Sequence, residues 1–432
     1  MKTTFQESIE ALYGLERRRD KLGLDGTRAL LASLGDPQSE WASVHVAGTN
    51  GKGSVCALIE RVLRAANVCT GLFTSPHLVD FRERIRVDGE WADEVRLARR
   101  LALIQKMKDG QGRTFFEVCT ALAFDDFAAR GVEWGVVEVG LGGRLDCTTV
   151  LEPTLTVITS VGLDHTELLG DTLEQVAAEK AGIVKPEVPL VSAIEEPAAA
   201  RVIEKAAAGC DAPLVLATER AAVVLQTAGP GGLRFAAAAE PWGTLELETG
   251  FRGRHQLENA RTALAALSAL AESGVEIPAD AVREGFAEAR WPGRLEPCPA
   301  EPRLWWDGAH NADGFRALAR AWREDLGFEP PAAVVLALSR DKDALAIARV
   351  VKEFVPAARL LVTRSRNERA MPAEDLARCA STAGLAPEAA PDVRRALEAA
   401  LAGGGGQVLL AGSLFAVGEA MEAWGGAPGE WL

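Results

Sequence analysis

The sequence predicts an α/β protein of two domains, a larger N-terminal one with a mostly parallel sheet and a smaller C-terminal one. The length of 432 residues exceeds that of a typical single domain. Short β-branched runs alternate with segments whose apolar residues recur at helical spacing. A turn-rich stretch at 291–297 interrupts this alternation, which then begins again. We therefore place the domains at residues 1–292 and 293–432.

The composition is that of a soluble globular protein and excludes several classes of function. Hydrophobic residues make up 48% of the chain and charged residues 25%. The N-terminus lacks the apolar core of a signal peptide, and no apolar run is long enough to span a membrane. A formal net charge of −14 argues against non-specific nucleic-acid binding. The seven cysteines occur singly, which fits a reducing cytoplasm. We expect a cytoplasmic protein that binds neither nucleic acid nor membrane.

The first domain is expected to begin with helical structure and to continue as strands alternating with helices. Residues 5–35 have a helical pattern, which a Gly-Asp-Pro sequence ends. The charged segment 78–87 is expected to be a loop too charged to be buried. The predicted strands cover 44–47, 68–73, 134–139, 154–161, 188–192 and 213–217. The predicted helices cover 54–63, 93–107, 116–130, 172–181 and 256–272.

The second domain is expected to be a smaller, Rossmann-like α/β domain without a phosphate loop of its own. The predicted strands cover 304–307, 334–338, 359–363 and 407–411. The predicted helices lie near 313–325, 343–354, 373–383 and 392–402. In such sheets the functional residues lie at the carboxyl ends of the strands.

A glycine-rich turn between the strand at 44–47 and the helix at 54–63 is the strongest functional motif. It reads Gly-Thr-Asn-Gly-Lys-Gly-Ser from Gly48 to Ser54. Glycines let backbone N–H groups turn inward, the helix N-terminus adds partial positive charge, and Lys52 can neutralise phosphates. The spacing departs from the usual phosphate-loop pattern, because two residues separate Gly48 from Gly51. We interpret the turn as a nucleotide triphosphate site and the first domain as P-loop NTPase-like.

Polar residues at the ends of other predicted strands suggest a site for a divalent cation. Glu138 ends a hydrophobic strand, where nucleotide enzymes place a carboxylate directed at magnesium. Ser75 and His165 follow what we expect to be neighbouring strands, so the three side chains could meet around one cation. Histidine is an unusual ligand for Mg²⁺, which leaves Mn²⁺ open.

The sequence positions of the remaining candidate residues differ in how strongly they indicate a functional role. His45 lies within a strand and is expected to be a core histidine. The strand ending in Asp-Gly-Ala-His-Asn at 307–311 is hard to explain by packing. By its spacing alone, Lys180 would be a solvated residue on a helix surface. Several arginines are either surface charges or contacts for phosphates and carboxylates, namely Arg82, Arg84, Arg86, Arg144 and Arg294.

Taken together, eight segments resemble those of the folylpolyglutamate synthase/dihydrofolate synthase family of the Mur ligase superfamily. They occur in the family's order and span most of the chain, so the combination is far more specific than any one of them. The segments are GTNGKGS at 48–54, TSPH at 74–77, EVGLGGRLD at 138–146, TSVGLDH at 159–165, EKAG at 179–182, HQLENA at 255–260, WPGR at 291–294 and DGAHN at 307–311.

The resemblance implies an ATP-dependent amide ligase. The carboxylate of dihydropteroate or of a folate would be phosphorylated to an acyl phosphate, and the amine of L-glutamate would displace the phosphate. The implied cofactors are ATP, Mg²⁺ or Mn²⁺, and a monovalent cation such as K⁺. By analogy the catalytic residues are Lys52, Lys180, Asp307 and His310. The implied ATP contacts are Gly48, Thr49, Asn50, Gly51, Lys52, Gly53, Ser54, Asn259, Arg294 and Asp307.

The resemblance also implies a metal site and a folate pocket. Ser75, Glu138 and His165 match metal ligands, and Lys180 matches a carbamylated lysine whose carbamate would face the metal. Ser413 matches a residue near the glutamate or the transferred phosphoryl group. The segment at 341–343 matches a family loop to which we assign no chemistry. The implied pterin or folate contacts are Leu22, Gly23, Leu24, Phe81, Arg82, Thr114, Phe115, Phe116, Glu117, Leu145, Asp146 and Cys147, the last replacing the family's usual Ser or Ala.

Alternatives remain both inside and outside this family. We expect the bifunctional enzyme, acting as a monomer on dihydropteroate and on folylpolyglutamate, but either activity alone would fit the same motifs. A Mur-type peptidoglycan ligase would carry a sugar-nucleotide domain before the phosphate loop, where this chain has 47 residues. A P-loop NTPase switch would not need a second domain that bears Asp-Gly-Ala-His-Asn.

Overall fold

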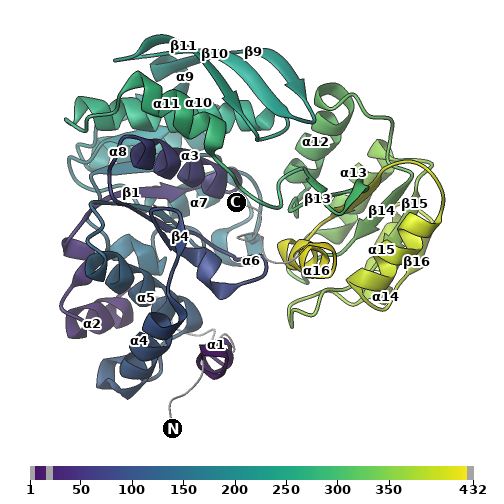
Figure 1. The fold of residues 1–432 in the computed structure, drawn as a ribbon, viewed down its shortest axis with the longest axis horizontal. Helices are drawn as coiled ribbons and strands as arrows, with labels where there is room; N and C mark the ends of the chain where they lie inside the picture. Colours follow the sequence, from purple (N-terminus) through teal and green to yellow (C-terminus); the bar gives the residue numbers. More distant parts are fainter. Residues whose placement is uncertain (1–4, 16–22, 426–432) are drawn as a thin grey trace.

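An eight-stranded sheet forms the centre of the N-terminal domain in the computed structural model, which describes residues 5–15 and 23–425 (Figure 1). Its strand order is β4-β3-β2-β5-β1-β6-β7-β8. All neighbours from β2 to β8 pair in parallel, whereas β3 and β4 add an antiparallel edge. The strands are β1 (Ala42–Ala47), β2 (Thr70–Phe73), β3 (Ile85–Val87), β4 (Glu90–Trp91), β5 (Trp134–Glu138), β6 (Leu155–Ile158), β7 (Leu190–Ser192) and β8 (Leu214–Leu216).

Helices cover both faces of this sheet, and the alternation of its strand residues explains why. On β5, Val136 belongs to the hydrophobic core formed with α3 and α10, whereas Val137 belongs to the core formed with α2, α4 and α5. Figure 1 shows these helix layers above and below the strands. The helices are α1 (Phe5–Tyr13), α2 (Asp25–Ser33), α3 (Lys52–Ala65), α4 (Glu94–Lys106), α5 (Phe115–Ala129), α6 (Thr166–Leu169), α7 (Leu173–Ala181), α8 (Pro197–Gly209), α9 (Ala217–Arg220), α10 (His255–Glu272) and α11 (Ala279–Glu288).

A second, antiparallel sheet lies on the outside of α10 and α11 and was not predicted (Figure 1). It consists of β9 (Ala221–Gly229), β10 (Gly232–Ala239) and β11 (Gly243–Thr249). Phe235 and Leu245 point into the core shared with the two helices. Alanine-rich strands such as β10 carry a weak strand signal, because alanine is depleted in sheets. The packing of this sheet against α10 and α11 outweighs the local preference.

The C-terminal domain is built on a six-stranded sheet of order β12-β13-β17-β14-β15-β16, parallel from β13 to β16. The expected division after residue 292 falls between α11 and β12 and stays a prediction. The strands are β12 (Glu296–Cys298), β13 (Glu301–Asp307), β14 (Ala333–Leu336), β15 (Arg359–Val362), β16 (Pro387–Ala389) and β17 (Val408–Ala411). The helices are α12 (Ala312–Arg320), continued by a π-helical turn (Ala321–Asp325), α13 (Ala344–Phe354), α14 (Ala373–Thr382), α15 (Val393–Ala402) and α16 (Leu414–Trp424).

The two-domain α/β prediction is confirmed, but two local predictions are wrong. The helical pattern at 5–35 contains two separate helices, α1 and α2. The segment at 78–87, expected to be exposed, forms a short 3₁₀ helix (Phe81–Arg84) and β3, and its charged residues Glu83, Arg84 and Arg86 are buried. Burial is tolerated because the Glu83 carboxylate accepts hydrogen bonds from three backbone N–H groups.

The prediction that Ser75 and His165 follow neighbouring strands is also wrong. Ser75 follows β2 and His165 follows β6, and both β5 and β1 lie between these strands. Sequence order alone does not give strand order in a doubly wound sheet.

In the part of the chain that the structure describes, no helix is both long enough and apolar enough to cross a membrane.

Candidate active site

A cavity of about 1100 Å³ lies between the two domains, at the carboxyl ends of β1, β5 and β6 on one side and of β13 and β17 on the other. Both domains thus present loops that follow parallel strands, the position at which α/β proteins bind ligands. The phosphate loop, Glu138 and Lys180 line the cavity from the N-terminal domain. Arg294, Asp307 and the loop that follows β13 line it from the C-terminal domain.

The phosphate loop is held open by the segment that follows β6. Thr49 N–H donates to Ser160 O at 2.9 Å, and Asn50 N–H donates to Ser160 Oγ at 2.8 Å. The Thr159 hydroxyl donates to Asn50 O at 2.7 Å. Glycine is required at Gly48, because a Cβ there would lie 1.9 Å from Thr159 Oγ1. The loop therefore has a defined shape before any phosphate binds.

Lys52 is the first residue of α3, and its ammonium group lies over this loop. Its Nζ donates to Gly48 O at 3.0 Å and to Thr49 O at 3.3 Å. Glu138 Oε1 lies 3.9 Å from the same Nζ. A phosphate in the loop would receive both this charge and the N–H groups at the start of α3.

Glu138 is a buried carboxylate at the end of β5. The residue is 4% exposed, and Oε2 accepts a hydrogen bond from Ser75 N–H at 3.0 Å. Burial raises the pKa of Glu138, whereas the positive charge of Lys52 opposes the rise. The structure thus brings Ser75 and Glu138 together, although β2 and β5 are far apart in sequence.

Lys180 is buried, so the prediction of a solvated helix residue is wrong. Its side chain is 3% exposed and lies on the inner face of α7 with Val176 and Ala177. Burial and then the charge of Lys52 lower the pKa of Lys180 to about 7. Among the described residues, Nζ has no hydrogen-bond or ion-pair partner. A lysine of this kind is partly neutral near pH 7 and can act as a nucleophile.

The C-terminal domain contributes a loop that is shaped by Asp307. Asp307 Oδ2 accepts a hydrogen bond from Leu295 N–H and Oδ1 accepts one from Ala309 N–H, both at 2.7 Å. His310 Nδ1 lies 2.7 Å from Gly308 O. Because a carbonyl only accepts, Nδ1 carries the proton, and in the neutral ring Nε2 keeps its lone pair. Nε2 faces Asp164 Oδ2 at 3.5 Å.

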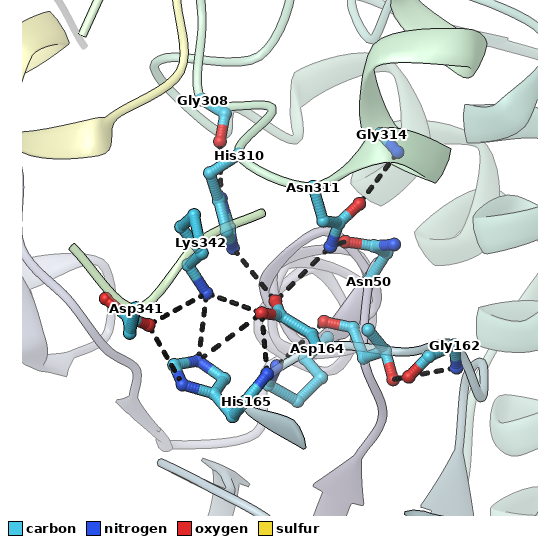
Figure 2. Close-up of polar contacts among 12 residues, drawn as sticks. Asn50, Gly162, Asp164, His165, Gly308, His310, Asn311, Gly314, Asp341 and Lys342 are labelled. Carbon is cyan, nitrogen blue, oxygen red and sulfur yellow. Dashed lines mark hydrogen bonds and ion pairs between the residues drawn. The ribbon is translucent and has the colours of Figure 1, made fainter. Parts of the chain in front are cut away.

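A network around Asp164 joins the two domains (Figure 2). Lys342 Nζ donates to Asp164 Oδ1 at 2.6 Å, and Asn311 Nδ2 donates to Asp164 Oδ2 at 3.3 Å. Asn311 also donates to Asn50 Oδ1 in the phosphate loop at 3.2 Å. Burial opposes ionisation, but the neighbouring His310 and the charge of Lys342 hold the pKa of Asp164 well below its usual range. The side chains of Asp164 and Lys342 are 9% and 7% exposed.

The loop at 341–343, to which the sequence assigned no chemistry, is therefore part of the site. Asp341 Oδ2 lies 3.2 Å from His165 Nδ1, and this hydrogen bond holds the pKa of Asp341 below its usual range. Lys342 Nζ lies 3.1 Å from His165 Nε2. The match of Asp-Lys-Asp to a family loop was the only sequence signal for this role.

Most of the candidate site residues meet at the cavity. The residues that line it are Gly48, Thr49, Asn50, Gly51, Lys52, Gly53, Ser54, Ser75, Thr114, Phe115, Phe116, Glu138, Asp146, His165, Lys180, Asn259, Arg294, Asp307, His310 and Ser413. The described candidates that do not line it are Gly23, Leu24, Phe81, Arg82, Glu117, Leu145 and Cys147. Leu22 lies outside the described residues.

Several of these outlying candidates have structural partners instead. Phe81 packs against His77 and Phe115. Arg82 forms ion pairs with Asp80 and Glu94. Glu117 and Thr114 form the capping box that begins α5. Their roles toward a folate stay predictions.

His45 is a core histidine, as predicted. Its side chain is fully buried in β1, and its Nε2 lies 2.8 Å from Thr148 Oγ1. Burial and then the charge of Lys185 lower its pKa to about 3, so the ring is neutral in the folded protein. His45 supports the strand below the phosphate loop and does not line the cavity.

The proposed metal ligands lie around the cavity without forming a dense cluster. Within the described ranges, no group of three or more His, Cys, Asp or Glu side chains is close enough to hold a metal ion. The expected set contains two such residues, Glu138 and His165, together with Ser75 and Lys180. All four line the same cavity. Their oxygen-rich chemistry would fit a hard cation if Lys180 carried a carbamate.

Comparison with known proteins identifies the domains and the family. Residues 46–267 match the Mur ligase middle domain, and residues 293–414 match the Mur ligase glutamate ligase domain. The chain is 38% identical over 333 residues to the dihydrofolate synthase/folylpolyglutamate synthase of Bacillus subtilis, covering 75% of this chain and 77% of that protein.

Solved structures of similar proteins cover nearly the whole chain. A Mycobacterium tuberculosis folylpolyglutamate synthase complexed with ADP superimposes with a TM-score of 0.89 at 31% identity, covering 98% and 99% of the two chains. A bifunctional folylpolyglutamate synthase/dihydrofolate synthase from Yersinia pestis, complexed with AMPPNP and Mn ion, gives 0.83 at 27% identity, covering 98% of each. The resemblance inferred from the eight motifs is confirmed, and the chain belongs to the folylpolyglutamate synthase/dihydrofolate synthase family of Mur ligases, which are ATP-dependent ligases.

Proposed function

We propose that this protein adds L-glutamate to dihydropteroate and to folylpolyglutamate, with ATP as the source of energy. The observation that carries the proposal is the shared cavity, into which one domain presents a phosphate loop and the other presents Asp307 and His310. Thr114, Phe115 and Phe116 add a partly aromatic wall, which suits a pterin or an aminobenzoate ring.

The first step is phosphorylation of the acceptor carboxylate. A carboxylate oxygen attacks the γ-phosphorus of ATP, the bond from that phosphorus to the β–γ bridging oxygen breaks, and ADP leaves. Lys52 and the N–H groups of the loop bind the phosphates and neutralise the charge that develops. The product is an acyl phosphate, which water would hydrolyse readily, so both domains must enclose it.

The second step is attack by the amine of L-glutamate. The nitrogen attacks the acyl carbon, the bond from carbon to the phosphate oxygen breaks, and inorganic phosphate leaves. His310 Nε2 would accept the proton released by the amine, because Nδ1 already donates to Gly308 O. The resulting imidazolium would be stabilised by Asp164, 3.5 Å away.

A divalent cation belongs to this proposal. Glu138 and a carbamylated Lys180 would give it anionic oxygen ligands, and His165 would join them once Lys342 Nζ leaves its Nε2. Ser75, Glu138, His165 and a carbamylated Lys180 would hold it, and it would shield the phosphate charges when bound. The buried and unpaired amine of Lys180, with a pKa lowered to about 7, supports carbamylation because only the neutral amine reacts with carbon dioxide. Mg²⁺ is our choice, Mn²⁺ is the alternative, and a monovalent cation such as K⁺ completes the set. Activity in potassium and in sodium salts would test the last component.

The protein is further proposed to be a cytoplasmic monomer that acts on small molecules and not on nucleic acid or membranes. The net charge of −14 supports this, since it would repel a nucleic-acid backbone. Size-exclusion chromatography with light scattering tests the monomer.

The test of the proposed function is glutamate-dependent release of ADP with each acceptor in turn. The purified protein is supplied with ATP, Mg²⁺ and L-glutamate, and with dihydropteroate or tetrahydrofolate. Turnover with both acceptors is the expected result. Turnover with one alone would assign the single activity. Release with neither, but with a sugar-nucleotide peptide, would contradict the proposal.

A further inference from the structure

Three arginines at 82, 84 and 86 follow the TSPH segment, and they face different environments. Arg82 is neutralised by Asp80 and Glu94. Arg86 is buried away from the cavity, and the nearest opposing charges are Glu83 and Glu60. Arg84 is the one of the three that lines the cavity.

Arg84 is a buried cation without a carboxylate in contact. Arg84 is only 5% exposed. In the described ranges, no Asp or Glu oxygen lies within ion-pair distance of its guanidinium. The charge of Arg84 lowers the pKa of Glu138 only slightly, less than the charges of Lys52 and Arg294 do. A buried charge without a partner is costly, so its presence at a cavity wall indicates an anionic ligand.

The guanidinium is fixed in place by neutral groups. Nε donates to His77 Nδ1 at 2.7 Å, and the guanidinium carbon lies 5.2 Å from the centre of the Phe115 ring. Arginine only donates, so Nδ1 of His77 carries no proton and the ring is neutral. The hydrogen bond to the neutral ring of His77 therefore leaves the positive charge of the guanidinium uncompensated, and its remaining N–H groups are available to a ligand. His77 is itself braced by Tyr13, whose hydroxyl lies 3.1 Å from Nε2.

The neighbours of Arg84 indicate what kind of anion it binds. Phe115 contacts Arg84 and lines the cavity together with Phe116, and Lys52 of the phosphate loop lies 3.9 Å from Glu138 in the same cavity. A ligand that rests on the aromatic wall and points a carboxylate toward the phosphate loop would pass Arg84. An aryl carboxylate has this shape, and arginine matches a carboxylate in two-point geometry.

We propose that Arg84 binds the carboxylate of dihydropteroate that receives the phosphoryl group, and that His77 is a positioning residue which holds Arg84 without neutralising it. This inference rests on the proposed function, because it takes dihydropteroate as the acceptor. Arg84 would hold the carboxylate against repulsion from the triphosphate while it approaches the γ-phosphorus.

The test compares dihydropteroate with its uncharged carboxamide, in the presence of a non-hydrolysable ATP analogue, by isothermal titration calorimetry. The wild-type protein should prefer the carboxylate by about 100-fold, as expected for a charged hydrogen-bonded pair. Arg84→Met should bind the two ligands with similar affinity. Arg86→Met is the matched control, since it removes a buried arginine outside the cavity, and it should keep the wild-type preference. Equal weakening of both ligands by Arg84→Met would overturn the proposal.

The role of His77 is tested by two substitutions that differ in hydrogen bonding. His77→Gln keeps a side-chain acceptor for Arg84, whereas His77→Phe removes it. The KM for dihydropteroate should rise about 10-fold in His77→Phe and stay near wild type in His77→Gln, with the KM for ATP unchanged in both. Equal defects in the two variants would reduce His77 to a packing role.

Failure of this inference can be told apart from failure of the proposed function. If the wild-type protein releases ADP with dihydropteroate but Arg84→Met keeps the preference for the carboxylate, the inference is wrong and the function stands. If the carboxylate preference depends on Arg84 but no ADP is released with either acceptor, the function is wrong and the binding site stands. If wild type binds neither ligand, both are wrong.

Discussion

The phosphate loop and the loop that follows β13 reach one cavity from opposite domains, but they are held in different ways. The phosphate loop is supported by Thr159 and Ser160 of its own domain. The side chains of the second loop instead reach across the interface, where Asn311 and His310 approach Asp164. We infer that the backbone shape of the phosphate loop is set within the N-terminal domain, whereas acyl transfer depends on how the domains are arranged.

The largest expected effect comes from removing the charge at the phosphate loop. Lys52→Ala should abolish turnover, a loss of about 10³-fold or more, because no other described side chain places an ammonium group over the loop. Steady-state ADP release measures the effect, and circular dichroism checks that the variant is folded. Wild-type rates in Lys52→Ala would show that this loop is not the phosphate site. The comparison between it and the loop that follows β13 would then be wrong.

A smaller loss is expected at Lys180, the buried amine that lines the same cavity. Lys180→Met should lower kcat by about 100-fold, the size seen when groups that support a metal site are lost. Removal of carbon dioxide and bicarbonate should slow the wild-type enzyme, and their return should restore it, because the amine of Lys180 has a pKa lowered to about 7. Lys180→Arg is the control that keeps a positive charge, and it should be as inactive as Lys180→Met. Full activity in Lys180→Arg would show that charge, and not a carbamate, is what matters.

Substitutions at the pair between the two domains should lower kcat without weakening ATP binding, unlike substitutions in the phosphate loop. Lys342→Met removes the bond at 2.6 Å between the domains, and Asp164→Asn removes the negative charge of its acceptor. We expect kcat to fall about 10-fold, since a truncated buried pair leaves its partner uncompensated. The dissociation constant for ATP should stay within about twofold of wild type, because Thr159 and Ser160 of the same domain hold the backbone of the phosphate loop. A large loss of ATP affinity would contradict the comparison, since it would make the shape of the phosphate loop depend on the pairing between the domains.

The sequence predicted the features that depend on residues close together in the chain. It did not predict those that depend on contacts between distant residues. The parallel strands and the glycine loop depend on residues near one another in the chain, so hydrophobic runs and turns revealed them. Burial of Lys180 and Arg84 depends on elements that pack against them from elsewhere, which no local spacing encodes. The pairing of Asp164 with Lys342 joins residues 178 positions apart and needs the domain arrangement itself. The alanine-rich β10 escaped prediction because packing, and not strand preference, stabilises it.

The smallest effect on activity is expected at His45, where the change should appear in stability instead. Its pKa is lowered to about 3 in the folded protein but should be near 6.5 when unfolded. Between these values the unfolded state binds the extra proton, so the free energy of unfolding falls as the pH is lowered. From pH 7 to pH 4.5 this should cost about 2.5 kcal/mol.

His45→Gln removes this titration and should make the fall smaller by that amount, while ADP release at pH 7 should change little because His45 does not line the cavity. Urea unfolding of both proteins at the two pH values measures the difference. The acid-sensitive carboxylates at the interface, Asp164 and Asp341, are present in both proteins and therefore cancel. An equal pH dependence in the two proteins would mean that β1 accepts a charged histidine. The strand beneath the phosphate loop would then be less rigidly packed than its hydrogen bonds imply. It would also give the loop less support from within its own domain.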